Sequence, residues 1–325
     1  MLNAPSISRF GTIALKLKKV TRGTLFIARS PEEIPAAIAK GAYGVIIDQT
    51  VIPKDKEIAW IRVDDITSTL PKLLRLWLMV NPRKFLFVPK QVMEFLYHIS
   101  FDPSLLLLKG HSEQMSAQIF ASGKNQRILC SNARFLEHIG LDIETIEAEP
   151  IPAEIVSHTL FETSLIINER YYERLPLVPC MTEYLRKAIG VLQKLNTPFT
   201  LSHLGYTPSF EPFFVNKRGK QLDFGESDRV VIFADSDLHC SCFQGFEKVR
   251  WTSCSLIIPT HIKFTCDIKL PKNLYGSVDQ LAQLMLTELK RPGYRILIGT
   301  ESSHFFHIME RLGVIDDYHA TKGLF

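Results

Sequence analysis

The stretch LLLLKGHSEQMSAQIF, residues 105–120, decides the fold class of this 325-residue chain. Four consecutive leucines are typical of a buried strand, Lys109-Gly110 ends the strand, and the residues after it have the spacing of an amphipathic helix. A strand, a glycine turn and a helix are the parts of a phosphate-binding loop, in which backbone N–H groups hold the phosphates. The stretch therefore predicts an α/β fold and raises the question of a nucleotide site.

The rest of the chain alternates between predicted strands and helices, which favours mostly parallel sheets. We expect a small N-terminal α/β domain over 1–82, a reduced doubly wound domain over 83–196 and a C-terminal α/β domain over 197–325. Strands are predicted at 24–28, 43–48, 58–65, 105–108, 125–132, 158–167, 228–237, 254–264 and 294–299, and helices at 30–41, 68–80, 111–120, 181–196, 277–290 and 302–313.

Composition restricts the function classes. The net charge of +4 comes from 38 basic and 34 acidic residues, an excess too small to argue for nucleic acid. The apolar stretch near 70–80 is interrupted by Lys72 and Arg75, so we expect no membrane span, and the N-terminus does not have the pattern of a signal peptide. Six cysteines in a chain of this length predict reduced thiols and a cytoplasmic protein.

Several segments, taken in order, resemble one family. RGTLFIARSPEEIPAAIAKGAYGVII at 22–47 follows a family pattern of G-D-L-F-x-A, a helix ending in A-x-x-K-G-A, and a strand. Later segments of the same family resemble IRVDDITSTLPKLL at 61–74, SNARFLEHIGLDIETI at 131–146 and LKRPGYRILIGTESSHFFHIMERLG at 289–313. The family is that of the Mur ligases, and the branch that adds D-alanyl-D-alanine fits best.

The resemblance implies a bacterial, cytoplasmic chain related to peptidoglycan synthesis, in a family that uses ATP and magnesium. It places the opening stretch on the family's ATP loop, T-G-x-N-G-K-T-T. Gly110, Ser112 and Ser116 then fall on the loop's first glycine, its asparagine and its last threonine, with Lys109 before them. The resemblance also implies that Glu162 stands where the family has a magnesium-binding glutamate.

Departures from the family predict a degenerate loop. Glu113 takes the place of the second glycine and Gln114 that of the lysine that contacts the phosphates. A like-charge contact at ~4 Å costs about 4 kcal/mol at an effective dielectric near 20, so Glu113 opposes phosphate binding. The family's D-S-R motif, which helps to shape its UDP site, reads Lys16-Leu17-Lys18 here.

We therefore expect a pseudoenzyme that acts as a binding or regulatory module, engaging cell-wall synthesis enzymes or a muropeptide precursor, with no cofactor. Residues left over from a nucleotide site would be Lys109, Gly110, Ser112, Ser116 and Glu162. The pattern assigns no catalytic residue.

Two alternatives stay open. One is an active ATP- and magnesium-dependent amide ligase with an atypical nucleotide site that uses Lys109, Lys124 and Glu162. The other is a metal-binding protein, because DSDLHCSC at 235–242 holds carboxylate, imidazole and thiol ligands close together. Its candidate ligands are Asp235, Asp237, His239, Cys240 and Cys242.

Overall fold

The structure is a computed structural model that describes residues 2–3, 5–7, 9–140, 144–146 and 149–311. The chain forms two compact units, Met1–Met93 with Phe101–Glu147 and Glu94–Ser100 with Ala148–Phe325. Each unit combines helices with parallel sheets, so the predicted α/β class is confirmed. The three domains over 1–82, 83–196 and 197–325 remain a prediction.

The first unit opens with a four-stranded parallel sheet in the order β1-β2-β3-β4. Its strands are β1 (Thr12–Ala14), β2 (Thr24–Ile27), β3 (Ala42–Ile47) and β4 (Ala59–Arg62). Between them lie the 3-10 helices η1 (Leu17–Lys19) and η2 (Pro31–Glu33) and helix α1 (Ile34–Ala39). The predicted helix after Ser30 thus starts as a 3-10 turn, and Gly41, with a φ of +92°, follows its end.

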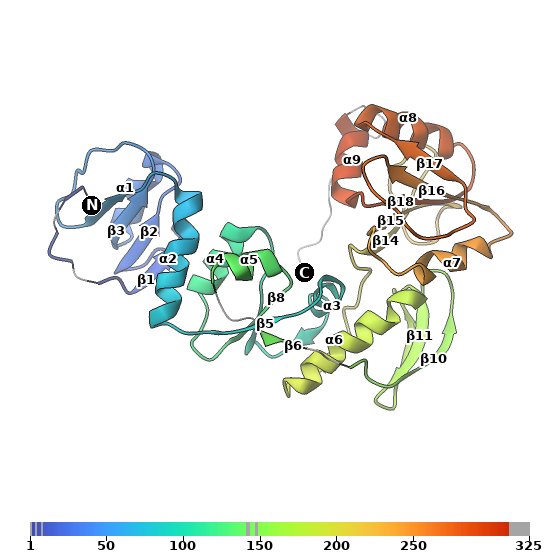
Figure 1. The fold of residues 1–325 in the computed structure, drawn as a ribbon, viewed down its shortest axis with the longest axis horizontal. Helices are drawn as coiled ribbons and strands as arrows, with labels where there is room; N and C mark the ends of the chain where they lie inside the picture. The colour runs from blue at the N-terminus through green and yellow to red at the C-terminus, as the bar shows by residue number, and fades with distance from the viewer. Residues whose placement is uncertain (1, 4, 8, 141–143, 147–148, 312–325) are drawn as a thin grey trace. The chain divides into compact units, whose positions relative to one another are not determined.

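Helix α2 (Ile66–Val80) connects the first sheet to the second (Figure 1). Asp65 caps it by accepting a hydrogen bond from the backbone N–H of Ser68. Its buried residues recur at every fourth position, which places them on one face of the helix; they are Ile66, Leu70, Leu74 and Leu78.

The second sheet of this unit is also parallel, in the order β7-β8-β5-β9. Its strands are β5 (Lys84–Phe87), β7 (Leu105–Leu107), β8 (Arg127–Cys130) and β9 (Glu144–Thr145). The accompanying elements are α3 (Lys90–Leu96), β6 (Ser100–Phe101), α4 (Ser112–Phe120) and α5 (Ala133–His138). Strand, turn and helix at 105–120 are confirmed, whereas β5 was missed because the segment at 81–84 suggested only a boundary.

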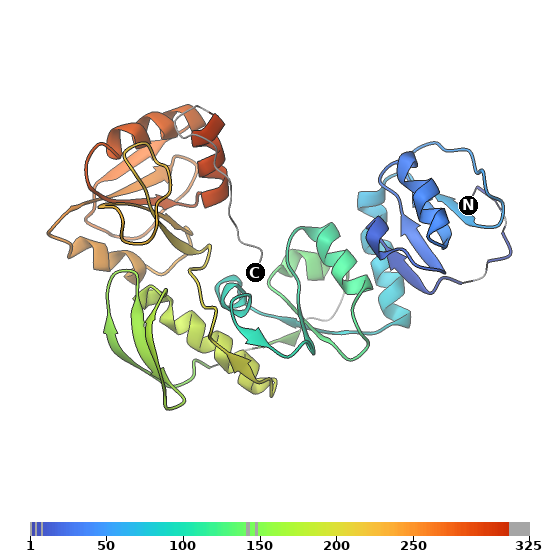
Figure 2. The same ribbon diagram turned by 180° about the vertical axis from the view of Figure 1, so that it is seen from behind.

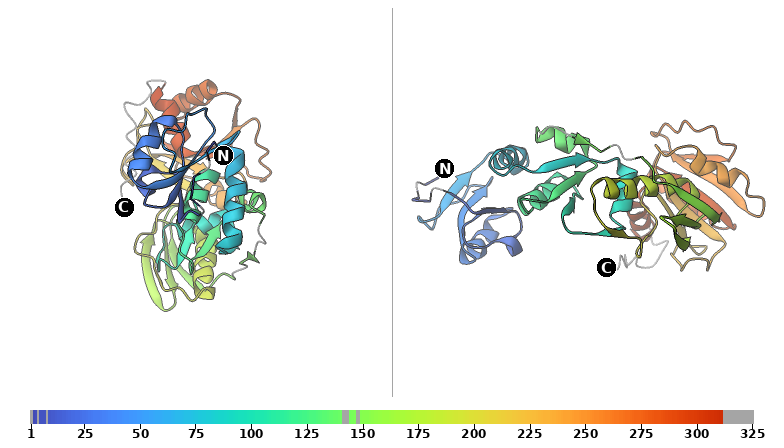
Figure 3. Two further views of the ribbon diagram at one scale, coloured as in Figure 1. Left: turned by 90° about the vertical axis from the view of Figure 1, so that its left-hand side faces the viewer. Right: turned by 90° about the horizontal axis from the view of Figure 1, so that it is seen from below.

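One hydrophobic core joins the two sheets of the first unit. Leu25 and Ile46 of the first sheet, Leu74 of α2, Ile119 of α4 and Ile128 of the second sheet all belong to it. Helix α4 packs against α2 on one side (Figures 1 and 3) and also contacts β1 of the first sheet. The helix of the opening stretch is therefore fixed from both sides.

The second unit contains an antiparallel sheet where a parallel strand was expected. Strands β10 (Ala153–His158), β11 (Thr163–Ile167) and β12 (Arg170–Leu175) pair in order, and helix α6 (Thr182–Lys194) runs alongside (Figure 2). The single strand predicted over 158–167 is wrong. The backbone N–H of Thr159 donates to the carbonyl of Glu162 at 2.8 Å, and the Thr159 hydroxyl accepts from the N–H of Glu162 at 2.9 Å. These bonds make a tight turn that the apolar pattern concealed.

A five-stranded sheet completes the second unit, in the order β14-β15-β18-β16-β17. Only the edge strand β14 is antiparallel to its neighbour. Its strands are β14 (Phe210–Phe214), β15 (Arg229–Ala234), β16 (Ser253–Pro259), β17 (Lys272–Tyr275) and β18 (Gly293–Ile298). The short strand β13 (Phe199–Thr200) lies outside this sheet. The helices are η3 (Pro179–Met181), α7 (Ser241–Glu247), α8 (Val278–Glu288) and α9 (Ser302–Arg311). Residues 312–313 of the last predicted helix lie outside the described part.

Helices α8 and α9 cover one face of this sheet (Figure 1). Met285 of α8 and Phe305 of α9 pack against Phe233 and Leu297 of the central strands, and all four are at most 1% exposed. The alternating strands and helices of this part are confirmed.

Four of the six cysteines form disulfides, so the expectation of reduced thiols is wrong for them. Cys180 bonds to Cys242 and Cys240 bonds to Cys266, with Cα–Cα distances of 5.1 and 5.4 Å. Cys130 and Cys254 are free. Partners 62 and 26 residues apart come from different elements, and spacing alone does not reveal such pairing. In the described residues, no helix is long and apolar enough to cross a bilayer.

The shared core predicts a large effect from a small change in α4. Ile119→Ala should lower the free energy of unfolding by about 2–5 kcal/mol, because Ile119 is fully buried and its loss leaves a cavity. Leu76→Ala is the matched control; Leu76 is 62% exposed on α2, and its loss should change stability by no more than about 0.5 kcal/mol. Urea unfolding measures both, and equal effects would contradict this core.

The disulfides predict the number of reactive thiols. Iodoacetamide should modify two cysteines when the chain is unfolded without reductant and six after reduction, as counted by intact mass. In the folded protein both free thiols should react slowly at pH 8, because burial raises the pKa of Cys130 and raises the pKa of Cys254 to about 11. Modification of all six cysteines without reductant would rule the pairing out.

Candidate functional site

The opening stretch folds as a strand, a glycine turn and a helix, the order of elements in a phosphate-binding loop. The N–H of Leu108 still donates to the carbonyl of Leu129 at 2.9 Å, so the sheet continues to the end of the leucine run. Gly110 then turns the chain with a φ of +89°, a conformation that favours glycine. Helix α4 begins two residues later, and its first turn carries Glu113.

The side chain of Gln114 lies over Gly110. A Cβ atom placed on Gly110 would collide with the side-chain amide of Gln114, so the amide contacts the backbone of the turn closely. The hydroxyl of Ser116 is buried and donates to the carbonyl of Ser112 at 2.8 Å, within the helix. Two positions that would face the nucleotide in a working loop are thus occupied with internal contacts.

Glu113 is neutralised within the protein. Its carboxylate forms an ion pair with Arg29, which directly follows Ala28 at the end of the β2 segment, and lies 3.9 Å from Nε2 of His111. The two paired side chains are 47% and 31% exposed, for Arg29 and Glu113 respectively. The negative charge that opposes phosphate is therefore held by the N-terminal sheet.

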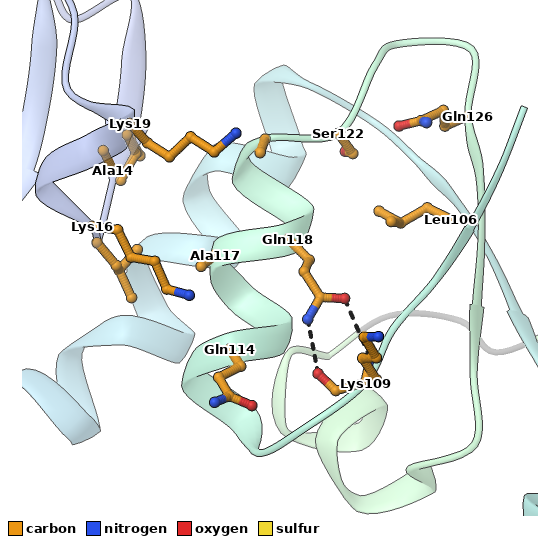
Figure 4. A pocket seen from close by; sticks show the side chains of 13 residues that line it. Ala14, Lys16, Lys19, Leu106, Lys109, Gln114, Ala117, Gln118, Ser122 and Gln126 are labelled. Atoms are coloured by element: carbon orange, nitrogen blue, oxygen red, sulfur yellow. Dashed lines mark hydrogen bonds between the residues drawn. The ribbon is translucent and has the colours of Figure 1, made fainter. Parts of the chain in front are cut away.

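Gln118 fixes the backbone of Lys109. Its side-chain oxygen accepts from the N–H of Lys109 at 3.3 Å, and its amide nitrogen donates to the carbonyl of Lys109 at 2.8 Å (Figure 4). Both bonds use main-chain atoms, so the ammonium group of Lys109 remains available.

A cavity of about 560 Å³ lies beside α4, between this helix and the segment of β1 and η1. Lys16 and Lys19 extend toward α4 from the η1 side, as Figure 4 shows, and Lys109 lines the cavity as well. Its other walls are apolar or carry amides. No Asp or Glu among the described residues lines it.

The other predicted nucleotide residues do not join this cavity. Lys124 is exposed and does not line it. Glu162 belongs to the second unit, where Nε and a terminal nitrogen of Arg174 donate to its carboxylate at 3.2 and 3.0 Å. It precedes β11 rather than ending a strand of the loop's sheet, so its predicted magnesium role lacks the expected setting.

The predicted metal ligands at 235–242 are engaged elsewhere. Cys240 and Cys242 are in disulfides, Asp235 accepts a hydrogen bond from Ser209 at 2.6 Å, and Nδ1 of His239 lies 2.9 Å from the hydroxyl of Ser241. Asp237 also has an interaction partner. Within the described residues, no three His, Cys, Asp or Glu side chains are grouped as a metal site, so the metal hypothesis gains no support.

Sequence reasoning missed the role of Lys19 and Arg29. Lys16 attracted notice only as a departure from the D-S-R motif. Lys16 and Lys19 are three residues apart, and residues at that spacing fall on one side of a 3-10 helix. That spacing was visible in the sequence, but the short helix and its distant neighbour α4 were not.

A comparison with models of protein families finds no match, and a comparison with curated proteins finds none. Among solved structures, MurF ligase from Thermotoga maritima in complex with ADP aligns with a TM-score of 0.48 at 12% identity, over 94% of this chain and 98% of that one. A MurF structure from Acinetobacter baumannii aligns with a TM-score of 0.49 at 10% identity, over 92% of each chain. The UDP-N-acetylmuramoylalanyl-D-glutamyl-2,6-diaminopimelate–D-alanyl-D-alanyl ligase of A. baumannii gives 0.49 at 9% identity, over 95% and 94%. Likeness at this level bears on neither activity nor ligand.

The pair of Arg29 and Glu113 predicts a small, salt-sensitive coupling. A double-mutant cycle with Arg29→Ala and Glu113→Ala should give a coupling energy of about 0.2–1 kcal/mol, because both side chains are partly exposed and solvent screens the pair. Urea unfolding of the four proteins in low salt measures it, and 1 M NaCl should reduce it. Additive effects in low salt would show that the pair does not form.

Proposed function

We propose that this chain is a Mur-ligase-like protein related to peptidoglycan precursor synthesis that does not use ATP at the loop after β7. It acts instead as a binding or regulatory module. One observation carries the proposal: the loop keeps its backbone turn, while Gln114 occupies the space over Gly110. A phosphate-binding loop needs that space open and lined by N–H groups.

The charge around the loop supports the same reading. A working loop places a lysine on the phosphates, whereas this chain has the neutral Gln114 at that position. A phosphate at the turn would lie beside the Glu113 carboxylate and would have to compete with it for Arg29. The ordered family motifs at 22–47 and 61–74 relate the chain to the Mur ligases, and the altered loop argues against their reaction.

Absence of ATP turnover is the first expected result. With magnesium, millimolar ATP, D-alanyl-D-alanine and a UDP-linked muramoyl tripeptide, the purified chain should release no phosphate above the protein-free background. A phosphate-release assay measures this, with an active Mur ligase as the positive control. Turnover that depends on the dipeptide would establish the alternative, an active ligase using Lys109, Lys124 and Glu162.

Restoring the glycine and the lysine of a phosphate-binding loop tests whether Glu113 and Gln114 are what prevents ATP binding. Glu113→Gly combined with Gln114→Lys should raise the shift in melting temperature caused by Mg-ATP, because the change removes a like charge and supplies a lysine. The comparison is made in a Lys16→Gln/Lys19→Gln background, so that anion binding in the nearby cavity contributes less to the shift. An equal ATP shift before and after restoration would show that the two residues are not what prevents nucleotide binding.

A further inference from the structure

The cavity beside α4 carries an unbalanced positive charge. Lys16, Lys19 and Lys109 all line it, and no acidic side chain of the described residues does. The side-chain nitrogens of these three lysines form neither a hydrogen bond nor an ion pair within the described part of the chain. Surface lysines commonly have acidic neighbours, so three unpaired ammonium groups around one hollow indicate an anionic ligand.

The lysines are placed by well-defined backbone. Lys16 and Lys19 are joined by a hydrogen bond from the N–H of Lys19 to the carbonyl of Lys16 at 2.8 Å, which closes the 3-10 turn. The side chain of Gln118, on α4, holds the main chain of Lys109 through two hydrogen bonds. Lys18, on the same turn, does not line the cavity. These backbone contacts therefore place the positive charges of Lys16, Lys19 and Lys109 at specific positions around the cavity.

The remaining walls restrict the size and chemistry of the ligand. Apolar side chains come from both sides: Ile13 of β1 on one, and Leu106 of β7 with Ala117 and Ala121 on the other. A volume of about 560 Å³ lies within the usual range for small-molecule sites. The amide of Gln126 is already bonded to Pro103 and Gly123, so the lysines supply most of the polar recognition.

We propose that this cavity binds a small organic polyanion, such as a phosphorylated metabolite with an apolar body. The anionic groups contact Lys16, Lys19 and Lys109, and the body lies along Leu106 and Ala117. The site lies along the flank of α4; Lys109, next to Gly110, and Gln114 line it too, whereas Lys16 and Lys19 come from outside the loop.

The test uses the full chain with two probes, 1-naphthyl phosphate and inorganic pyrophosphate, measured by calorimetry. Both should bind in 50 mM NaCl and weaken at least fivefold in 500 mM NaCl, because salt screens exposed charge. Lys16→Gln/Lys19→Gln and Lys109→Gln should each weaken binding by about three- to tenfold or more. The matched controls Lys18→Gln and Lys124→Gln, which remove equal charge outside the cavity, should change it less than twofold.

A variant that fills the cavity distinguishes binding inside the cavity from binding to a charged surface. Ala117→Phe should reduce binding of 1-naphthyl phosphate much more than binding of pyrophosphate, because the ring occupies the space of the ligand's body. Unchanged urea midpoints show that the variants fold.

Three outcomes would overturn the proposal. They are no binding of either probe at millimolar concentration in 50 mM NaCl, equal losses in Lys18→Gln and Lys16→Gln/Lys19→Gln, and tighter binding of a 20-nucleotide RNA with the same lysine dependence. None of them depends on phosphate release from ATP, so failure here is distinguishable from failure of the proposed function.

Discussion

Burial of one face of α4 is the constraint on which the first unit depends. Met115, Ile119 and Phe120 are at most 6% exposed and belong to the core shared by both sheets. Each such side chain contributes about 1.5–3 kcal/mol by leaving water. Since these residues hold the two sheets together, the strand, turn and helix persist for structural reasons, whatever chemistry the turn performs.

The polar groups of the turn then find partners inside the protein. A phosphate-binding loop leaves N–H groups and a lysine waiting for the ligand, at a cost in stability when the ligand is absent. Here Glu113 pairs with Arg29, Ser116 donates to Ser112, and Gln114 lies over Gly110. Each contact makes the empty loop more stable and the bound loop less accessible, so stability and nucleotide binding oppose one another at this turn.

Local patterns were readable from the sequence, and long-range ones were not. The leucine run at 105–108 and the amphipathic spacing after Gly110 predicted their elements because the signals lie within a few residues. The turn at Thr159–Glu162 was missed since two apolar half-strands around it look like one strand. The strand, turn and helix at 105–120 were foreseen. The partners of Glu113 and Cys242 come from distant segments, and only the folded chain brings them together.

Positive charge remains near the loop but has a different position. At the turn, a lysine in line with the helix N-terminus would combine its charge with the helix dipole. Lys16 and Lys19 come from the η1 segment and Lys109 directly precedes the turn, and all three are exposed to solvent. Three ammonium groups around a hollow repel one another, although water at a dielectric near 80 limits this to about 1 kcal/mol per contact at 4 Å. An anion that enters offsets that repulsion, so positive charge that is tolerated in the free protein attracts an anion that reaches the three groups.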